Sequence, residues 1–203
     1  MQLTRIGDQP VLTPRPDVPW ESGAVLNAAA AYADGKYHLL YRAVSHVPRR
    51  NVSSIGYAWS EDGVHFERLD EPVLRAGDVP EESAGAEDPR VTRIGDTYYL
   101  TYTAWDGHRA QIAYATSKDL RHWQRQGILY PYEQMGHNKN ACLFPEKIHG
   151  EYALIHRPIG KGVFDDSGEQ TPLDMYISFS PDLRNWHDDQ PLLTTRRGRS
   201  EEH

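Results

Sequence analysis

The sequence predicts an all-β fold assembled from repeated four-stranded units. Short β-type runs alternate with turn residues along the 203 residues, and no convincing helical period lies between them. Three long segments resemble one another, and each offers four such runs. Twelve tyrosines and five tryptophans supply aromatic side chains of the kind that β-sheets favour. Four strands per repeat are typical of the blades of a β-propeller, which bury their faces only by stacking around an axis.

Each repeat contains three pieces in a fixed order. The first piece is a glycine followed by an apolar run, and its copies are 35–42, 95–102 and 150–157. The second begins with a serine and ends six residues later in an aromatic residue, at 60–66, 117–123 and 180–186. A short closing piece follows at 72–74, 128–130 and 191–193. In the first repeat we expect strands near 25–33, 37–43, 53–59 and 65–74.

The repeats define one partial propeller domain over residues 1–203. We expect its blades at about 20–75, 84–131 and 138–195. Residues 10–14 resemble the closing pieces but precede the first blade, so we predict an outer strand there that completes the last blade of a ring. Because that last blade is not in the chain, the sequence predicts the N-terminal part of a larger propeller. The alternative is a complete protein that closes its ring as a homo-oligomer.

Composition restricts the class of partner and the compartment. The net charge of −7 argues against a nucleic-acid partner and against an anionic membrane surface. A single cysteine, Cys142, excludes an internal disulfide and lies in the apolar run 141–144, as a small buried hydrophobe does. The first residues contain no apolar stretch, and no segment approaches the length of a membrane span. We therefore expect a soluble, cytoplasmic protein.

The stretch 85–90, Gly-Ala-Glu-Asp-Pro-Arg, is the predicted centre of the chemistry. It combines an adjacent acid pair with a proline and an arginine, and a strand, a tight turn at 95–96 and a second strand follow. Pro89 lacks an N–H, so we expect it at the start of the first strand. Asp88 would then project its carboxylate into an opening. The alternative is an aspartate that accepts loop N–H groups beside a salt bridge with Arg90.

Several motifs carry a resemblance to a known family. They are 27–30 (Asn-Ala-Ala-Ala), 39–43, 85–90, 117–123, 138–147 with its Phe-Pro-Glu-Lys, and 156–158 (His-Arg-Pro). In these motifs the chain resembles glycoside hydrolase family 130, which contains β-mannoside phosphorylases and some β-mannosidases on a five-bladed β-propeller. The resemblance runs from about residue 11 to residue 195. The last two blades of the family are not in the chain.

The resemblance implies an activity and a set of site residues. It implies phosphorolysis of β-mannoside oligosaccharides by inorganic phosphate to α-mannose 1-phosphate, without a cofactor, and the alternatives are a β-mannoside hydrolase or an inactive partial propeller. It implies that Asp88 is the general acid and acts through the mannosyl 3-hydroxyl. The predicted phosphate-binding residues are Lys139, Asn140 and Arg157. The predicted substrate-binding residues are Asn27, Arg42, Glu87 and Arg90.

The residue types favour phosphorolysis on chemical grounds as well. An inverting glycosidase needs two carboxylates, one as acid and one as base for water. A phosphorylase needs only the acid, together with cations that hold the phosphate. Arg42 and Arg157 each lie seven residues after a repeat glycine, where the middle repeat has Tyr102, so we expect the two arginines to converge. The alternative is a pair of salt bridges at blade edges.

Two further features complete the predictions. The histidines show no metal-ligand spacing, so we expect no catalytic metal. Residues 161–169 are rich in glycine and acids, and we expect a mobile insertion there, which either lines the acceptor side of the site or is inert.

Overall fold

The computed structural model describes residues 5–46, 51–160 and 173–194. These residues are mostly strands, which confirms the predicted all-β fold. The predicted insertion at 161–169 lies outside the described residues. The strands form three antiparallel groups of four, each paired in chain order, and the first two groups touch through one parallel pairing between Ser53 and Gly85.

The bounds of the elements follow the repeat. The first group contains β1 (Ala24–Ala33), β2 (Lys36–Val44), β3 (Ser53–Ser60) and β4 (Glu67–Arg68). The second contains β5 (Gly85–Ile94), β6 (Thr97–Trp105), β7 (Ala110–Ser117) and β8 (Gln124–Tyr130). The third contains β9 (His137–Leu143), β10 (Tyr152–Gly160), β11 (Met175–Ser180) and β12 (His187–Leu193). One short helix precedes each group: η1 (Pro19–Glu21), η2 (Pro80–Glu82) and α1 (Tyr132–Met135).

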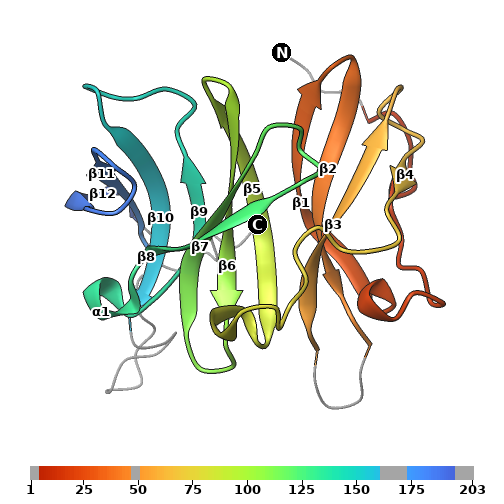
Figure 1. The fold of residues 1–203 in the computed structure, drawn as a ribbon, viewed down its shortest axis with the longest axis horizontal. Helices are drawn as coiled ribbons and strands as arrows, with labels where there is room; N and C mark the ends of the chain where they lie inside the picture. Colours follow the sequence, from red (N-terminus) through yellow and green to blue (C-terminus); the bar gives the residue numbers. More distant parts are fainter. Residues whose placement is uncertain (1–4, 47–50, 161–172, 195–203) are drawn as a thin grey trace.

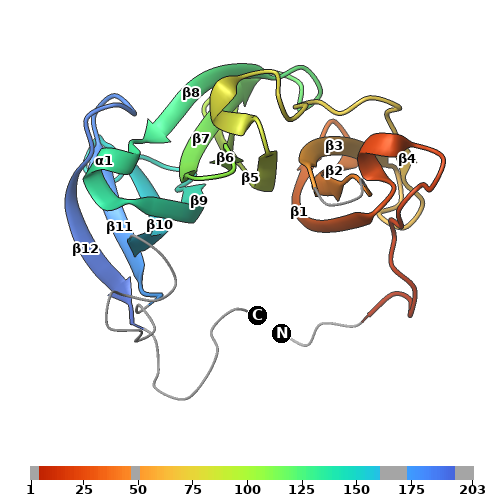
Figure 2. The ribbon, with the colours of Figure 1, turned by 90° about the horizontal axis from the view of Figure 1, so that it is seen from below.

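The three groups stand side by side along an arc. Strands β1, β5 and β9 lie on the concave side of the arc, and β4, β8 and β12 lie on the convex side (Figure 2). The three concave strands run in the same direction (Figure 1). Residues at equivalent positions of β1, β5 and β9 are therefore presented at the same end of the molecule.

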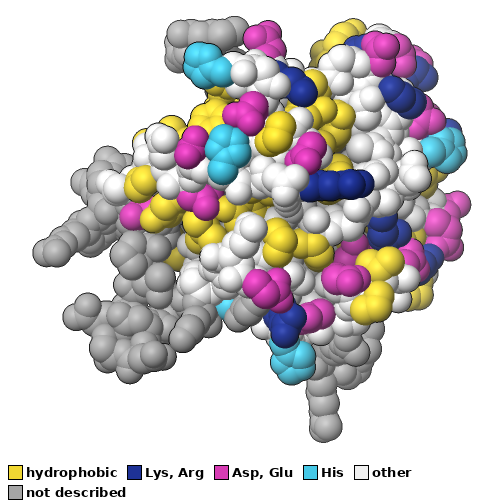
Figure 3. Space-filling view, turned by 60° about the vertical axis from the view of Figure 1, so that its left-hand side comes forward, with side chains coloured by type: hydrophobic (Ala, Val, Ile, Leu, Met, Phe, Trp, Pro, Cys, Tyr) yellow, Lys and Arg dark blue, Asp and Glu magenta, His cyan; other side chains and the backbone are white. Residues whose placement is uncertain are grey.

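Apolar packing joins each group to the next. One cluster lies between the first and second groups and includes Leu40, Ile55 and Leu100. A second cluster lies between the second and third groups and includes Ile112 and Leu154. A sheet has two faces to bury, and stacking the groups covers the inner faces. Figure 3, with the side of β9–β12 turned forward, shows hydrophobic side chains among acidic, basic and histidine side chains.

Two predicted strands differ from the structure. The fourth strand of the first group was expected at 65–74, but β4 has only two residues, and the segment continues as a loop with one isolated bridge between Ile55 and Leu74. Residues 10–14, expected as a ring-closing strand, contain no strand. A strand needs a neighbour to pair with, and here side chains hold the segment instead. The Thr13 carbonyl accepts a hydrogen bond from Arg68, and Leu12 packs against the buried cluster of Tyr41, Ala43 and Ala58.

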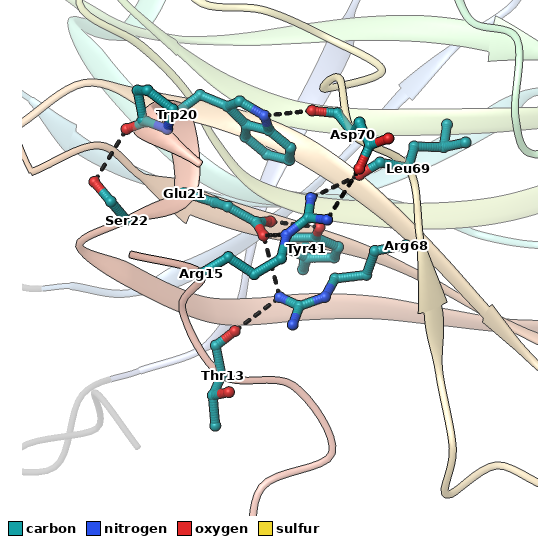
Figure 4. Close-up of polar contacts among 10 residues, drawn as sticks. Thr13, Arg15, Trp20, Glu21, Ser22, Tyr41, Arg68, Leu69 and Asp70 are labelled. Carbon is teal, nitrogen blue, oxygen red and sulfur yellow. Dashed lines mark hydrogen bonds and ion pairs between the residues drawn. The ribbon is translucent and has the colours of Figure 1, made fainter. Parts of the chain in front are cut away.

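A buried glutamate ties η1 to the first group. Glu21 is fully buried and accepts a hydrogen bond from the Tyr41 hydroxyl at 2.7 Å (Figure 4). Arg68 contacts the same carboxylate at 3.2 Å, and Arg15 forms an ion pair with it. Burial, together with the Glu21 charge, raises the pKa of the Tyr41 hydroxyl. Two cations and a hydroxyl therefore compensate a charge that would be costly to bury alone.

The second group repeats this arrangement. Glu82 at the end of η2 is buried and accepts a hydrogen bond from the Tyr102 hydroxyl at 2.5 Å. Arg125 on β8 contacts the Glu82 carboxylate at 3.0 Å. The tyrosine of the central strand, the arginine of the outer strand and the glutamate of the short helix thus form one module that occurs twice. The module explains why tyrosine, and not an apolar residue, occupies the middle of β2 and β6.

The third group replaces this module with a histidine network. His156 takes the position of Tyr41 and Tyr102, because each of the three lies opposite an irregularity in the inner strand. Its Nε2 lies 2.6 Å from Ser178 Oγ, and Ser178 donates to Asp189. Burial lowers the pKa of the His156 imidazole to about 4, so the ring is neutral at pH 7. A neutral ring needs no buried counter-ion of its own.

The serine-led piece of the repeat forms the turn before the outer strand. In the first group Asp62 accepts hydrogen bonds from the backbone N–H groups of Val64 and His65, both at 2.8 Å. Asp119 and Asp182 make the corresponding contacts in the other groups. These bonds favour the carboxylate and lower its pKa, in Asp182 to about 2. The piece is therefore a structural turn.

Candidate active site

Three equivalent bulges shape the concave strands. The pairing of β1, β5 and β9 with the next strand shifts register at a matching place in each group, at Asn27, Asp88 and Asn140. These residues have φ values of 49°, 52° and 59°, in the left-handed region. Asparagine and aspartate tolerate that region better than other residues with a side chain. The bulges thus place three polar side chains at matching positions of neighbouring strands.

Asp88 and Pro89 do not lie where the sequence placed them. Strand β5 begins at Gly85, so both residues are inside the strand and not at its start. The prediction failed because a proline normally cannot sit within a hydrogen-bonded ladder. The bulge removes the difficulty, since it leaves residues of the bulged strand unpaired and the missing N–H of Pro89 costs nothing there.

Two residues of the first group hold the carboxylate of Asp88. Asn27 Nδ2 donates a hydrogen bond to Asp88 Oδ1 at 2.7 Å. Arg42 Nη1 contacts the same oxygen at 3.1 Å. The Asp88 side chain is 11% exposed and its contact with Arg42 is partly buried, whereas Asn27 lies at the exposed surface. Asn27 and Arg42, which precede Asp88 by 61 and 46 residues in the chain, therefore meet at one of its oxygen atoms.

Arg42 also binds the neighbouring acid. Its Nη2 donates to Glu87 Oε1 at 2.8 Å, and its Nε donates to Ser53 Oγ at 2.9 Å. The hydroxyl of Ser53 in turn donates to Glu87 Oε1 at 3.3 Å. Burial raises the pKa of Glu87, the Asp88 charge adds to this effect, and the charges of Arg42 and Lys139 oppose it. One guanidinium thus bridges both acids of the stretch 85–90.

Arg90 has a different role from the one expected in the salt-bridge alternative. Its Nη1 donates to the carbonyl of Pro89 at 2.8 Å and lies 3.5 Å from the carbonyl of Asn27. The basic partner of Asp88 is Arg42 from the neighbouring group. Arg90 therefore contacts backbone carbonyls of two bulges, the one at Asp88 and the one at Asn27.

Lys139 and Arg157 form a pair in the third group. They are directly opposite each other on β9 and β10, and Asn140 follows Lys139 at the bulge. Burial raises the pKa of Glu87, and the charge of Lys139 opposes that rise as the charge of Arg42 does, so the ammonium acts on the same carboxylate as Arg42. The structure thus brings Asn27, Arg42, Glu87 and Asp88 into direct contact and links Lys139 to them electrostatically.

The expected equivalence of Arg42 and Arg157 is confirmed, because each pairs with the residue just before a bulge, but Tyr102 is not their counterpart in the middle group. Arg42 pairs with Leu26, and Thr103 pairs with Glu87, each just before a bulge. The middle counterpart of Arg42 is therefore Thr103. The cause is the hairpin turn: its glycine is the second turn residue at Gly35 but the first at Gly95. Asp34 and Gly35 both have positive φ, as in a type I′ turn, whereas only the glycine does in the second hairpin.

Sequence reasoning missed Ser53. This residue is 1% exposed, begins β3 and lies between Arg42 and Glu87. It belongs to no repeated piece, and one of its contacts is with an acid 34 residues away. Only the pairing of β2 with β3 indicates that it reaches the arginine.

Within residues 5–46, 51–160 and 173–194, no group of three or more His, Cys, Asp or Glu side chains could hold a metal ion. In the same ranges no helix has both the length and the apolar character needed to cross a bilayer.

Comparison with known proteins identifies the family. A family model described as β-1,4-mannooligosaccharide phosphorylase matches residues 5–202. The chain belongs to glycoside hydrolase family 130. The resemblance found in the motifs is therefore confirmed.

Three relatives illustrate the position of the chain within family 130. It is 41% identical to a 1,2-β-oligomannan phosphorylase of Thermoanaerobacter sp. (strain X514) over 95% of its own length and 62% of the relative's. It is 43% identical to a β-1,2-mannobiose phosphorylase of the same strain, over 77% and 54% of the two lengths. The solved structure of β-1,2-mannobiose phosphorylase from Listeria innocua, in complex with β-1,2-mannobiose, matches with a TM-score of 0.74 and 29% identity over 93% of this chain and 65% of that one. The chain thus spans between about half and two thirds of the length of these family 130 relatives.

Proposed function

We propose that the protein is a β-mannoside phosphorylase that transfers a mannosyl group to inorganic phosphate and releases α-mannose 1-phosphate. The observation that carries the proposal is one held acid, Asp88, beside a site to which the next group of strands contributes Lys139 and Arg157. The printed names of the three relatives, all phosphorylases of β-1,2-linked mannosides or oligomannan, support it.

The reaction needs one proton donor. An oxygen of phosphate forms a bond to C1 of the mannosyl unit while the glycosidic C1–O bond breaks, so the β configuration becomes α. Asp88 gives its proton, relayed by the mannosyl 3-hydroxyl, to the leaving sugar oxygen. Glu87 and Asp88 are adjacent and share the Arg42 guanidinium, so they are poorly placed to bracket a sugar from opposite faces. That arrangement disfavours the acid and base pair of an inverting hydrolase.

The nucleophile needs positive charge. A phosphate dianion loses its hydration on entering the site, which costs several kcal/mol without charged or hydrogen-bonding partners. Lys139, Arg157 and Asn140 are the proposed partners, and Arg42 is committed to the two acids. The sugar side is assigned to the edge formed by Glu87 and Arg90.

We further propose that β-1,2-linked mannosides are the preferred substrates. The relatives that share 41% and 43% identity with this chain carry names of β-1,2 phosphorylases. A β-1,4-mannooligosaccharide phosphorylase of Ruminococcus albus shares only 27%. The higher identity to the β-1,2 phosphorylases supports this part of the proposal.

The strand groups are the proposed blades of the family propeller. In this proposal residues 20–75, 84–131 and 138–195 are three blades of a five-bladed ring, and residues 10–14, which form no strand here, become one by pairing with the outer edge of its last blade. A ring closed by a homo-oligomer is the other arrangement. The antiparallel groups of four and their arc support the blade assignment. The acidic composition and the single cysteine suit a cytoplasmic enzyme.

The test is an incubation of the complete protein that carries this chain. β-1,2-Mannobiose and β-1,4-mannobiose are each supplied with and without phosphate, and the products are scored for mannose 1-phosphate. We expect the sugar phosphate from β-1,2-mannobiose only when phosphate is present, and almost none from the Asp88→Asn variant. Equal release of free mannose with and without phosphate would identify a hydrolase instead, and near-normal turnover by Asp88→Asn would place the acid elsewhere.

A further inference from the structure

The two oxygens of the Asp88 carboxyl group have different surroundings. Oδ1 accepts the hydrogen bonds of Asn27 and Arg42 at 2.7 and 3.1 Å. Among the described residues, no hydrogen bond or ion pair ends on Oδ2. A protonated carboxylic acid carries its proton on one oxygen, and the other oxygen accepts. Donors on Oδ1 therefore direct the proton to Oδ2.

We infer that Asn27 and Arg42 are positioning residues that fix Asp88 Oδ1, so that Oδ2 is the oxygen that delivers the proton to the substrate. This inference rests on the proposed function and deepens it. It also reassigns Asn27 and Arg42, which the sequence placed among residues that bind the sugar directly.

The charge that develops during the reaction strengthens these contacts. When Oδ2 loses its proton, the negative charge spreads over both oxygens of Asp88. The Asn27 amide and the Arg42 guanidinium already point at Oδ1, so they stabilise that charge without reorganising. Hydrogen bonds to an ionised acceptor are about twice as strong as those between neutral groups. The two contacts therefore favour the transition state over the ground state, and their loss should lower kcat more than it raises KM.

The backbone and a buried serine hold the two donors in place. Asn27 has φ 49°, a conformation that few residues with a side chain adopt, and the bulge of β1 aims its amide across the boundary between the groups. Arg42 is held at its Nε by the buried hydroxyl of Ser53. The acid on β5 is thus oriented by the first group of strands and not by its own.

Asn27→Gly is the sharpest variant, since glycine keeps the left-handed backbone and removes only the amide. In the complete protein we expect it to lower kcat about 10- to 100-fold while the KM for mannobiose changes less than about threefold. Asn140→Gly is the matched control at the equivalent bulge, and there we expect a higher KM for phosphate. Ser53→Ala should lower kcat in the same sense as Asn27→Gly but by a smaller factor.

A second readout does not need turnover. In protein labelled with ¹³C at the aspartate carboxyl carbons, the Asp88 signal is assigned by its loss in Asp88→Asn. We expect Asn27→Gly to shift that signal and Asn140→Gly to leave it in place. An unchanged Asp88 signal in Asn27→Gly, or an unchanged kcat in an active enzyme, overturns the inference. If Asn27→Gly shifts the Asp88 signal but the wild-type protein shows no phosphorolysis, the proposed function is overturned and the contact between Asn27 and the Asp88 carboxyl group stands.

Discussion

Replacing Glu21 by glutamine tests whether the buried charge module of Figure 4 stabilises the fold. Glutamine keeps the shape of the side chain but removes the negative charge, and it leaves Arg15 and Arg68 facing a neutral group. Removing one partner of a buried ion pair costs about 3–5 kcal/mol. The arginine side chains remain 25% and 16% exposed, so we expect the lower end of that range, about 3 kcal/mol.

The assay is urea denaturation at pH 7, with the slope of free energy against urea as a check that the unfolded state is unchanged. Asp70→Asn is the matched control, because Asp70 contacts Arg15 at 3.2 Å in the same cluster but is 94% exposed. We expect it to change stability by less than about 0.5 kcal/mol. Glu82→Gln should reproduce the loss seen in Glu21→Gln, since Tyr102 and Arg125 repeat the same contacts.

A loss in Glu21→Gln that is no larger than the loss in Asp70→Asn would refute the reasoning. It would mean that solvent compensates the arginines as well as the carboxylate does. Equal slopes, with lower midpoints in Glu21→Gln and Glu82→Gln than in Asp70→Asn, are the pattern that supports the module.

Three further predictions concern pH, packing and phosphate. The folded-state pKa of His156 is about 4, below the unfolded value of 6.5, so the unfolded state binds the proton first and stability falls as the pH drops from 6.5 to 4. Denaturation curves at pH 7 and pH 4.5 should differ by up to about 3 kcal/mol from this group, and His156→Gln should remove that part. Gly56→Ala should destabilise the first group by about 1–3 kcal/mol, because a Cβ there would lie 2.3 Å from the buried, hydrogen-bonded ring of Tyr41; an unchanged melting temperature would show that the ring moves freely. Arg157→Ala should raise the KM for phosphate at least tenfold and change the KM for the mannoside little. Steady-state kinetics with each substrate varied in turn measure both constants, and an equal rise in the two would contradict the assignment of Arg157 to phosphate.

The sequence predicted the strand groups well because their signals are local. Alternation and turn residues act over short stretches, each repeated piece is shorter than about ten residues, and together they determined where the hairpins form. Counting from the turn glycine gave the wrong residue in the middle group, because Gly35 is the second residue of its turn and Gly95 is the first. The predicted counterpart of Arg42 was therefore one residue away from the observed one.

The site depended on features that no local pattern shows. Three left-handed bulges at Asn27, Asp88 and Asn140 set the direction of the polar side chains, and a bulge is defined by the pairing of two strands. The contact of Ser53 with Glu87 and that of Asn27 with Asp88 join different groups of strands. Residue types could nominate the acid and the cations, but packing of the groups decided which cation meets which acid.

The measurement that tests the central claim most directly is the origin of the oxygen bound to C1 of the released mannose. The complete protein is incubated with β-1,2-mannobiose and phosphate in H₂¹⁸O, and the products are followed by ³¹P NMR and mass spectrometry. If phosphate is the nucleophile, an α-mannose 1-phosphate resonance appears and the transferred mannosyl unit carries no ¹⁸O at the start of the reaction. Free mannose that contains ¹⁸O at C1 from the first turnover, with no sugar phosphate, would contradict the account.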